Sequence, residues 1–165
     1  MKHSFISFLN LSKNNLNAIK LKDKKGASLL EGYDALIKLS RNLKTSYDGQ
    51  VARNGGNSDA EVLIREAYSR FYAKHIDVVS QYIRFFNQIL IFVDDCKLDE
   101  KQKYWNLIRD QLRSEELVIL FYHAWTNDDF ISLDVLMKRN FFKYLRSDDL
   151  FDEELHKNKL EIGST

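Results

Sequence analysis

Two adjacent stripes of apolar residues run along residues 58–94, and they constrain the fold more than any other feature of the sequence. The first stripe repeats at alternating steps of four and three residues and consists of Tyr72, Ile76, Val79, Ile83, Phe86, Leu90 and Val93. The second lies one residue earlier at each step and consists of Phe71, Val78, Tyr82, Phe85, Ile89 and Phe92, with His75 as its interruption. Such steps are typical of one helix face, and two stripes make an apolar arc too wide for a single partner. The sequence therefore predicts one long helix over residues 58–94 at the centre of a bundle.

The rest of the chain also shows helical spacing, and proline, the strongest helix breaker, is absent. Further helices are predicted over residues 4–21, 29–43, 99–112, 114–125 and 130–145, with a loop over 47–57. The predicted helix caps are Ser58, Asp59, Asp99 and Ser114. We expect an all-α fold, a single-domain bundle of about six helices around the central helix. The domain is expected to span residues 1–145, followed by an acidic, partly disordered C-terminal tail over 146–165.

The charges of the chain nearly cancel, with Lys+Arg 25 against Asp+Glu 24. A dedicated nucleic-acid binder usually carries a basic excess, so this balance argues mildly against that class. The distribution is uneven, because residues 1–45 hold nine Lys or Arg and three acids, whereas 146–165 hold three and six. Solvated helix faces and an acidic tail explain this most simply. The alternative is a basic N-terminal face that meets an acidic surface, such as a neighbouring subunit.

The residue inventory offers little for metal or cofactor chemistry. Cys96 is the only cysteine, which excludes an intrachain disulfide and a thiolate cluster within one chain. The four histidines lie in unrelated segments: His3, His75, His123 and His156. We therefore expect no metal site and no cofactor. The N-terminus lacks the pattern of a secretory leader, and the longest apolar run outside it is residues 89–93, so a cytoplasmic location is expected.

One pair of residues matches a catalytic pattern. Arg70 and His75 form R-x-x-x-x-H, which resembles the signature of helical ribonucleases in the HEPN superfamily. In such a pair the histidine would act as acid or base, and the arginine would stabilise a phosphate. Two observations favour a structural interpretation instead. An ideal helix turns the two side chains about 140° apart, and Phe71 stands where those nucleases typically have a polar residue.

Several polar residues are embedded in otherwise apolar stretches. They are Arg84, Arg109, Gln111, Glu116, Tyr122 and His123. Buried polar groups need partners, so these residues are expected to form a network that joins the third, fourth and fifth helices. Arg109 and Glu116 are the predicted ion pair across the joint between two of these helices.

Residues 71–122 contain two motifs of a known family. The chain reads F-Y-A-K-H-I-D-V-V-S-Q-Y-I-R-F-F-N-Q-I-L-I-F-V-D-D and then Y-W-N-L-I-R-D-Q-L-R-S-E-E-L-V-I-L-F-Y-H. These stretches resemble the core of the putative phage abortive-infection (AbiC-type) family, which has F-Y-x-K…H-Y-F-R-x-L-Y-x-I-L-x-F-I before R-A-Q-L-S-x-x-E-L-x-L-L-F-Y-N. The N-terminal S-F-I-S-F-L-N-L-S-K-N-N is similar to the opening helix of the family, so the likeness spans residues 5–145. The residues that match by position are Tyr82, Arg84, Arg109, Gln111, Leu112, Glu116, Leu117, Phe121 and Tyr122.

The chain also departs from the family pattern. The departures are Gln81, Ile83, Arg113 and His123, where the family has His, Phe, Ser and Asn. If the family histidine is catalytic, Gln81 removes it, so the departures favour a structural or recognition role over hydrolysis. Family members commonly carry N-terminal membrane helices, which this chain is expected to lack.

The resemblance implies a role in phage defence by abortive infection. In the favoured hypothesis the chain is a non-enzymatic sensor, effector or interaction module whose partner is a phage or host protein, or a co-encoded defence protein. In the second hypothesis it is an RNA-cleaving toxin that uses Arg70 and His75 as a dimer, and RNA is a partner only in this case. In the third it is a helical adaptor unrelated to defence. A homo-oligomer is left open.

Overall fold

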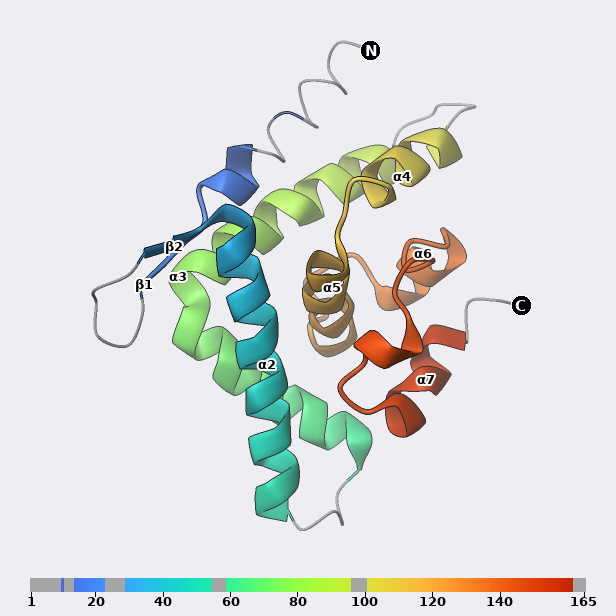
Figure 1. Cartoon of the computed structure of the whole chain (residues 1–165). Coiled ribbons are helices and arrows are strands. Elements are labelled where there is room, and N and C mark those ends of the chain that lie inside the picture. Colours follow the sequence, from blue (N-terminus) through green and yellow to red (C-terminus); the bar gives the residue numbers. More distant parts are fainter. Residues whose placement is uncertain (1–9, 11–13, 23–28, 55–58, 96–100, 162–165) are drawn as a thin grey trace.

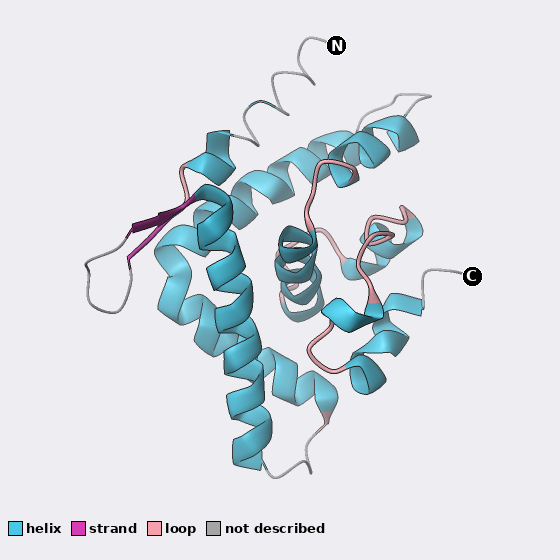
Figure 2. Ribbon diagram, viewed as in Figure 1, coloured by secondary structure: helices cyan, strands magenta, loops and turns pink. Residues whose placement is uncertain are grey.

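The computed structural model describes residues 10, 14–22, 29–54, 59–95 and 101–161 (Figure 1). These residues form a helical domain with one small β-hairpin, as Figure 2 shows. The elements are β1 (Lys20–Lys22), β2 (Leu29–Glu31), α2 (Gly32–Asn54), α3 (Ala60–Asp95), α4 (Lys101–Arg109), α5 (Ser114–Thr126), α6 (Leu133–Lys138), the 3-10 turn η1 (Ser147–Asp149) and α7 (Glu153–Glu161). The predicted all-α fold around a long central helix is confirmed.

Helix α3 is that central helix. It buries residues of both predicted stripes, and Phe71, Val79, Tyr82 and Phe86 are each 3% exposed or less. α2 packs along its N-terminal half, and α4 and α5 contact it further on (Figure 1). By length and composition alone α3 would also suffice to cross a membrane, with a mean hydropathy of 1.2 over its most apolar window. In this structure its buried face is covered by these three helices.

Helix α5 is enclosed by the other helices. Every residue from 116 to 125 is buried, because α2 and α3 lie on one side of it and α6 and the C-terminal segment on the other (Figure 1). Its predicted cap, Ser114, is wrong by one residue. Arg113 is the N-cap, and its backbone N–H donates to Oε2 of Glu116 over 3.1 Å.

The β-hairpin replaces part of two predicted helices. The predicted helix over 4–21 is wrong at its C-terminal end, since residues 14–17 are helical and β1 follows; residues 1–9 and 11–13 lie outside the described part. β1 pairs antiparallel with β2, with Leu21 opposite Leu30. Ile19 and Leu21 are both buried, and a spacing of two residues places side chains on one face of a strand, not of a helix.

Helix α2 is longer than predicted. Residues 47–54, expected to be a loop, continue the helix, and Tyr47 and Gln50 are both 2% exposed. These two residues extend the buried face that Leu39 and Leu43 begin, at steps of four, four and three residues. Gly49 suggested a loop, but a single glycine inside a helix costs only about 0.5–1 kcal/mol relative to alanine. Packing on α3 outweighs that cost.

In the last quarter of the chain, the helix predicted over 130–145 is shorter than expected, and further helical turns follow it. The expected helix over 130–145 is wrong in extent, since α6 ends at Lys138 and Asn140 adopts a left-handed φ of 55°. The residues after 145 form η1 and α7, and His156 is fully buried there. The acidic composition gave no sign of this packing, because the few buried side chains stand among charged ones.

The predicted cap Asp59 is consistent with the structure, since its side chain accepts from the backbone N–H of Glu61. The other predicted caps, Ser58 and Asp99, lie outside the described residues.

Candidate functional site

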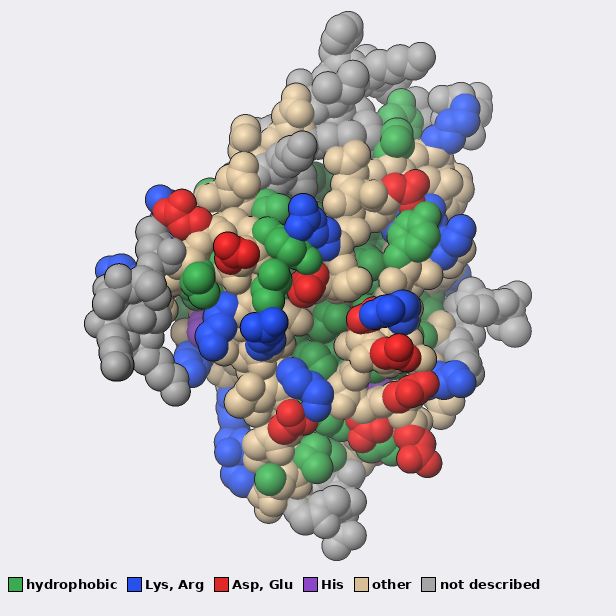
Figure 3. Space-filling model, in the orientation of Figure 1, with side chains coloured by type: hydrophobic (Ala, Val, Ile, Leu, Met, Phe, Trp, Pro, Cys, Tyr) green, Lys and Arg blue, Asp and Glu red, His purple; other side chains and the backbone are tan. Residues whose placement is uncertain are grey.

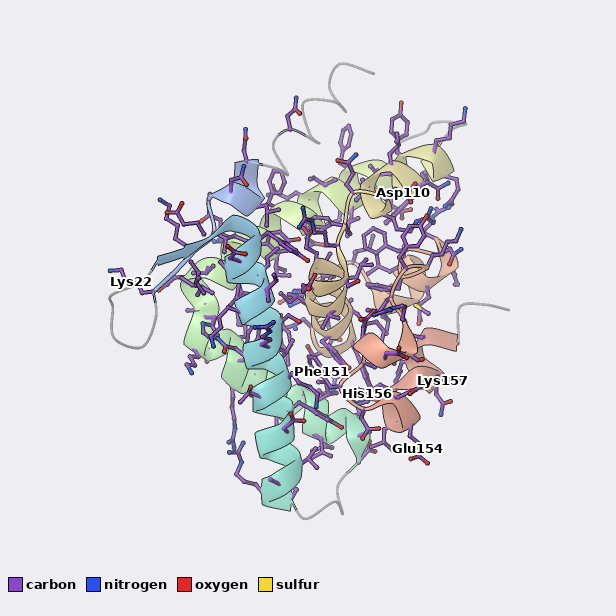
Figure 4. All side chains as sticks on the ribbon, viewed as in Figure 1. Lys22, Asp110, Phe151, Glu154, His156 and Lys157 are labelled. Carbon is purple, nitrogen blue, oxygen red and sulfur yellow. The ribbon has the colours of Figure 1, made fainter. Side chains whose placement is uncertain are left out.

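A groove of about 780 Å³ lies between α2, α3 and the β-hairpin. Five cations line it: Lys22, Lys38, Arg53, Arg70 and Lys74. The other lining residues are Leu21, Leu30, Asn42, Thr45, Ser46, Gly49, Phe71 and His75. We call this feature the cationic groove. Lys22 projects from the hairpin in Figure 4, and Lys and Arg side chains lie along α2 in Figure 3, with a His side chain beside them.

The lining residues of α2 share one helix face. Lys38, Asn42, Thr45, Gly49 and Arg53 follow one another at steps of three or four residues, which is the spacing of neighbours on a helix surface. Lys38 and Arg53 are therefore about 22 Å apart along the helix axis. The groove is an elongated feature that follows α2.

The electrostatics of the groove are one-sided. Among the residues that the structure describes, no acidic side chain lines it, and none forms an ion pair with its five cations. Nearby cations outside the groove do have acidic partners, as Lys20 pairs with Glu31 over 3.0 Å and Lys44 pairs with Asp48. Arg53 donates to Oε1 of Gln50, a neutral acceptor. Within the described residues, the five positive charges thus face one space that no acidic side chain lines.

Arg70 and His75 both line the groove. The expectation that the two side chains diverge assumed an ideal helix, whereas α3 is kinked at His75, with φ −121° and ψ 20°. Nε2 of His75 lies 3.3 Å from the side-chain amide of Asn42, so the imidazole accepts and is neutral in this arrangement. Burial, and secondarily the charge of Lys74, lowers the pKa of His75. While Asn42 donates to Nε2, Nδ1 carries the ring hydrogen, so His75 can accept a proton only after its contact with Asn42 is broken.

The predicted polar network divides into separate pairs. Tyr82 donates to Oε1 of Glu116 over 2.7 Å, which joins α3 to the first turn of α5. Burial raises the pKa of Glu116, although the hydrogen bonds from Tyr82 and from the backbone of Arg113 oppose that shift. Burial and the nearby Glu116 raise the pKa of Tyr82. This pair fastens two helices together.

Arg109 does not pair with Glu116, so that prediction is wrong. Its guanidinium binds Oδ1 of Asp110 over 2.9 Å and the backbone carbonyl of Asn140 over 3.2 Å, and it lies over the ring of Tyr144. Arg109 is 6% exposed. It therefore holds the chain that follows α6 against α4, which is a structural task.

His123 and Tyr122, two further members of the predicted network, each form a buried tyrosine–histidine pair. Nδ1 of His123 lies 2.7 Å from the hydroxyl of Tyr68. The hydroxyl of Tyr122 lies 2.9 Å from Nδ1 of His156 and accepts from the backbone of Phe151 over 2.8 Å. Burial lowers the pKa of His123 and of His156 to about 4. Phe151 and His156 lie on the α2 side of the C-terminal segment (Figure 4).

The last two members of the predicted network, Arg84 and Gln111, form no side-chain hydrogen bond with the other members, all of which lie in the described part of the chain. Arg84 is exposed and donates to the carbonyl of Ser80 in its own helix. Gln111 is exposed as well. The network therefore has no common site, and its buried members specify the packing of α3, α4, α5 and α7.

Sequence reasoning missed most of the cationic groove. Lys22 and Arg53 were not singled out because they come from a hairpin and a helix end that the helical pattern did not predict. Lys38 lies in a predicted helix, but it looked like any other exposed lysine there. The basic excess in residues 1–45 was the available signal, since Lys22 and Lys38 belong to it. Within the described part of the chain, no group of three or more His, Cys, Asp or Glu is placed to hold a metal ion.

Residues 74–150 match the sequence model of a family described as Putative phage abortive infection protein. The match covers just under half of the chain, and it confirms over this stretch the resemblance seen in residues 71–122. It contains Tyr82, Arg109 and Glu116, and from the groove it contains Lys74 and His75. No curated protein and no solved structure matches the chain.

Proposed function

Because residues 74–150 match phage abortive-infection proteins, we propose that this chain is a cytoplasmic binding module of phage defence that acts through the cationic groove. The module recognises an anionic partner, and recognition contributes to the arrest of an infected cell. In this proposal the buried polar pairs hold the helices in place and do not take part in the recognition.

The five cations that line the groove carry this proposal, since none of them forms an ion pair within the part of the chain that the structure describes. Positive charges gathered on one concave surface raise the local positive potential, which favours the binding of an anionic ligand. The buried polar residues shared with the family do not offer such a surface. Glu116 and Arg109 are buried, and each is satisfied by partners within the chain.

A phage plating assay tests the proposal. Cells that express the wild-type chain are compared with cells that express Arg70→Gln or Lys38→Gln, which remove one groove charge each. The matched control is Arg41→Gln, which removes an exposed charge from α2 outside the groove lining. We expect the groove variants to weaken protection and the control to retain it. Full protection by both groove variants at wild-type protein levels would contradict the proposal.

A second candidate function is cleavage of RNA, favoured by the placement of Arg70 and His75 in one groove. In this candidate His75, released from Asn42, takes the proton from a ribose 2′-hydroxyl, whose oxygen attacks the adjacent phosphorus. The P–O5′ bond breaks, the leaving 5′-oxygen takes a proton from water, and Arg70 neutralises the phosphate. Purified chain incubated with total RNA tests it, with His75→Ala as the variant. Cleavage that depends on His75 supports this candidate, and intact RNA after prolonged incubation with the wild-type chain rules it out under those conditions.

A further inference from the structure

We infer that the ligand of the cationic groove is the phosphodiester backbone of a single-stranded nucleic acid. The inference rests on the proposed function, since it names the ligand class of the same groove. It adds that recognition is directed at phosphates and is independent of base sequence.

The shape of the charge distribution supports a chain-like anion. Lys38 and Arg53 lie about 22 Å apart on α2, and Arg70 and Lys74 follow the groove on α3. A compact anion, such as a single phosphate or a nucleotide, cannot contact cations spread over that length. A flexible strand that carries one charge per nucleotide can contact them in succession.

The neutral polar side chains of the groove are already engaged within the protein. The Ser46 hydroxyl donates to the carbonyl of Ala67 over 2.8 Å, the Thr45 hydroxyl donates to the carbonyl of Arg41 over 2.9 Å, and Asn42 contacts His75. The charged donors left for a ligand are the ammonium and guanidinium groups, beside the Nδ1–H of His75 and the second amide hydrogen of Asn42. Such donors recognise phosphate charge and do not distinguish bases.

The lining of the groove argues against a protein partner, and its concave shape argues against a double helix. Phe71 is 2% exposed and Leu21 is 8% exposed, so within the described lining neither side chain provides a stacking platform for a base. Neither provides the exposed apolar anchor that a protein partner normally needs. A double helix presents its phosphates on a convex surface and does not enter a narrow groove. A single strand satisfies the charges with its bases directed outward.

Fluorescence anisotropy with labelled 12-nucleotide oligouridine and oligodeoxythymidine tests the inference, and the two probes distinguish RNA from DNA. If all five cations contact phosphates, log K falls with log salt with a slope of about −3.5, since each single-strand contact contributes about −0.7. Raising the salt from 50 to 200 mM then weakens binding on the order of 100-fold. A gel of the same samples establishes that the probe remains intact.

Groove variants give the residue-level readout. Lys38→Gln and Arg70→Gln should each reduce the magnitude of the slope by about 0.7, whereas Arg41→Gln should leave it unchanged. Oligouridine and oligoadenosine should bind within about threefold of each other, because phosphates carry the affinity.

Three results would overturn the inference: a slope that the groove variants do not change, tighter binding of ATP than of the oligonucleotides, or equally tight binding of a polyglutamate peptide of the same charge. If protection from phage depends on the groove but the oligonucleotides do not bind, the inference fails while the proposed function stands. If the oligonucleotides bind but protection is independent of the groove, the proposed function fails alone.

Discussion

The hydroxyl of Tyr82 donates a 2.7 Å hydrogen bond to Glu116, and this contact ties the middle of α3 to the first turn of α5. The same carboxylate accepts from the backbone of Arg113, so it caps α5 and joins two helices at once. Both residues match the family motifs by position, and both lie in the stretch that matches the family. These two residues of the shared motif therefore have a role in packing.

Removing the hydroxyl of Tyr82 should destabilise the fold. Tyr82→Phe leaves a buried carboxylate with one donor fewer, at an expected cost of about 1–3 kcal/mol, and it should raise the pKa of Glu116 further because that hydrogen bond favours the charged form. Urea denaturation at neutral pH measures the loss. Tyr144→Phe is the control, because Tyr144 is 46% exposed, and its effect should stay within about 0.5 kcal/mol. Equal stability of the two variants would show that the contact with Glu116 contributes little.

Two glycines should respond to alanine with opposite signs. Gly32 adopts a φ of +55° at the start of α2, a left-handed conformation that costs a residue with a Cβ about 1–2 kcal/mol. Gly49 lies inside α2, and an added Cβ would meet Arg53 at an ordinary distance of 3.8 Å. Gly32→Ala should therefore destabilise the chain, whereas Gly49→Ala should stabilise it by about 0.5–1 kcal/mol. Thermal unfolding of both variants beside wild type measures the two shifts, and shifts of the same sign would contradict the assigned backbone conformations.

Stability should fall as the pH is lowered from 6.5 to 4. Burial lowers the pKa of His123 and of His156 to about 4, so over this range the unfolded chain binds protons that the folded chain excludes. Protonation of each histidine then lowers the free energy of unfolding by up to about 3 kcal/mol. This loss is complete once the pH is below the pKa of that histidine in the folded chain. Glu116 opposes the trend, because its raised pKa favours proton uptake by the folded state.

Urea denaturation at several pH values measures this dependence. His156→Gln should flatten the profile, since one of the two buried imidazoles is gone while an acceptor for the Tyr122 hydroxyl remains. His75 is only partly buried, so His75→Gln should change the profile less. A wild-type profile that is flat between pH 6.5 and 4 would contradict the burial of the two histidines.

The sequence was most informative where many side chains share one environment. The two stripes of α3 identify the central helix because a broad apolar arc must be covered by several neighbours. β1 could not be predicted in this way, because three residues are too few to show a period, and Leu21 and Ile19 fit a helix pattern as well as a strand. The kink at His75 is equally hidden, since neither a proline nor a glycine marks it in the sequence.

The candidate site was predicted in part. Several polar residues of the family motifs are buried, but burial alone does not specify a partner, and Arg109 binds Asp110 and Asn140 instead of Glu116. Arg70 and His75 were identified from their spacing. The other groove cations come from β1, α2 and a neighbouring turn of α3, and surface lysines of this kind differ in no visible way from solvated ones until the fold gathers them.

The most direct test of the central claim is phage plating on cells that express a triple groove variant, Lys38→Gln/Arg70→Gln/Lys74→Gln. Its matched control keeps every charge but exchanges the residue types, Lys38→Arg/Arg70→Lys/Lys74→Arg. If the groove acts through its positive charge, the neutralised variant fails to protect at wild-type protein levels, whereas the control retains most of the protection. Equal protection by the neutralised variant and the wild-type chain would contradict the account.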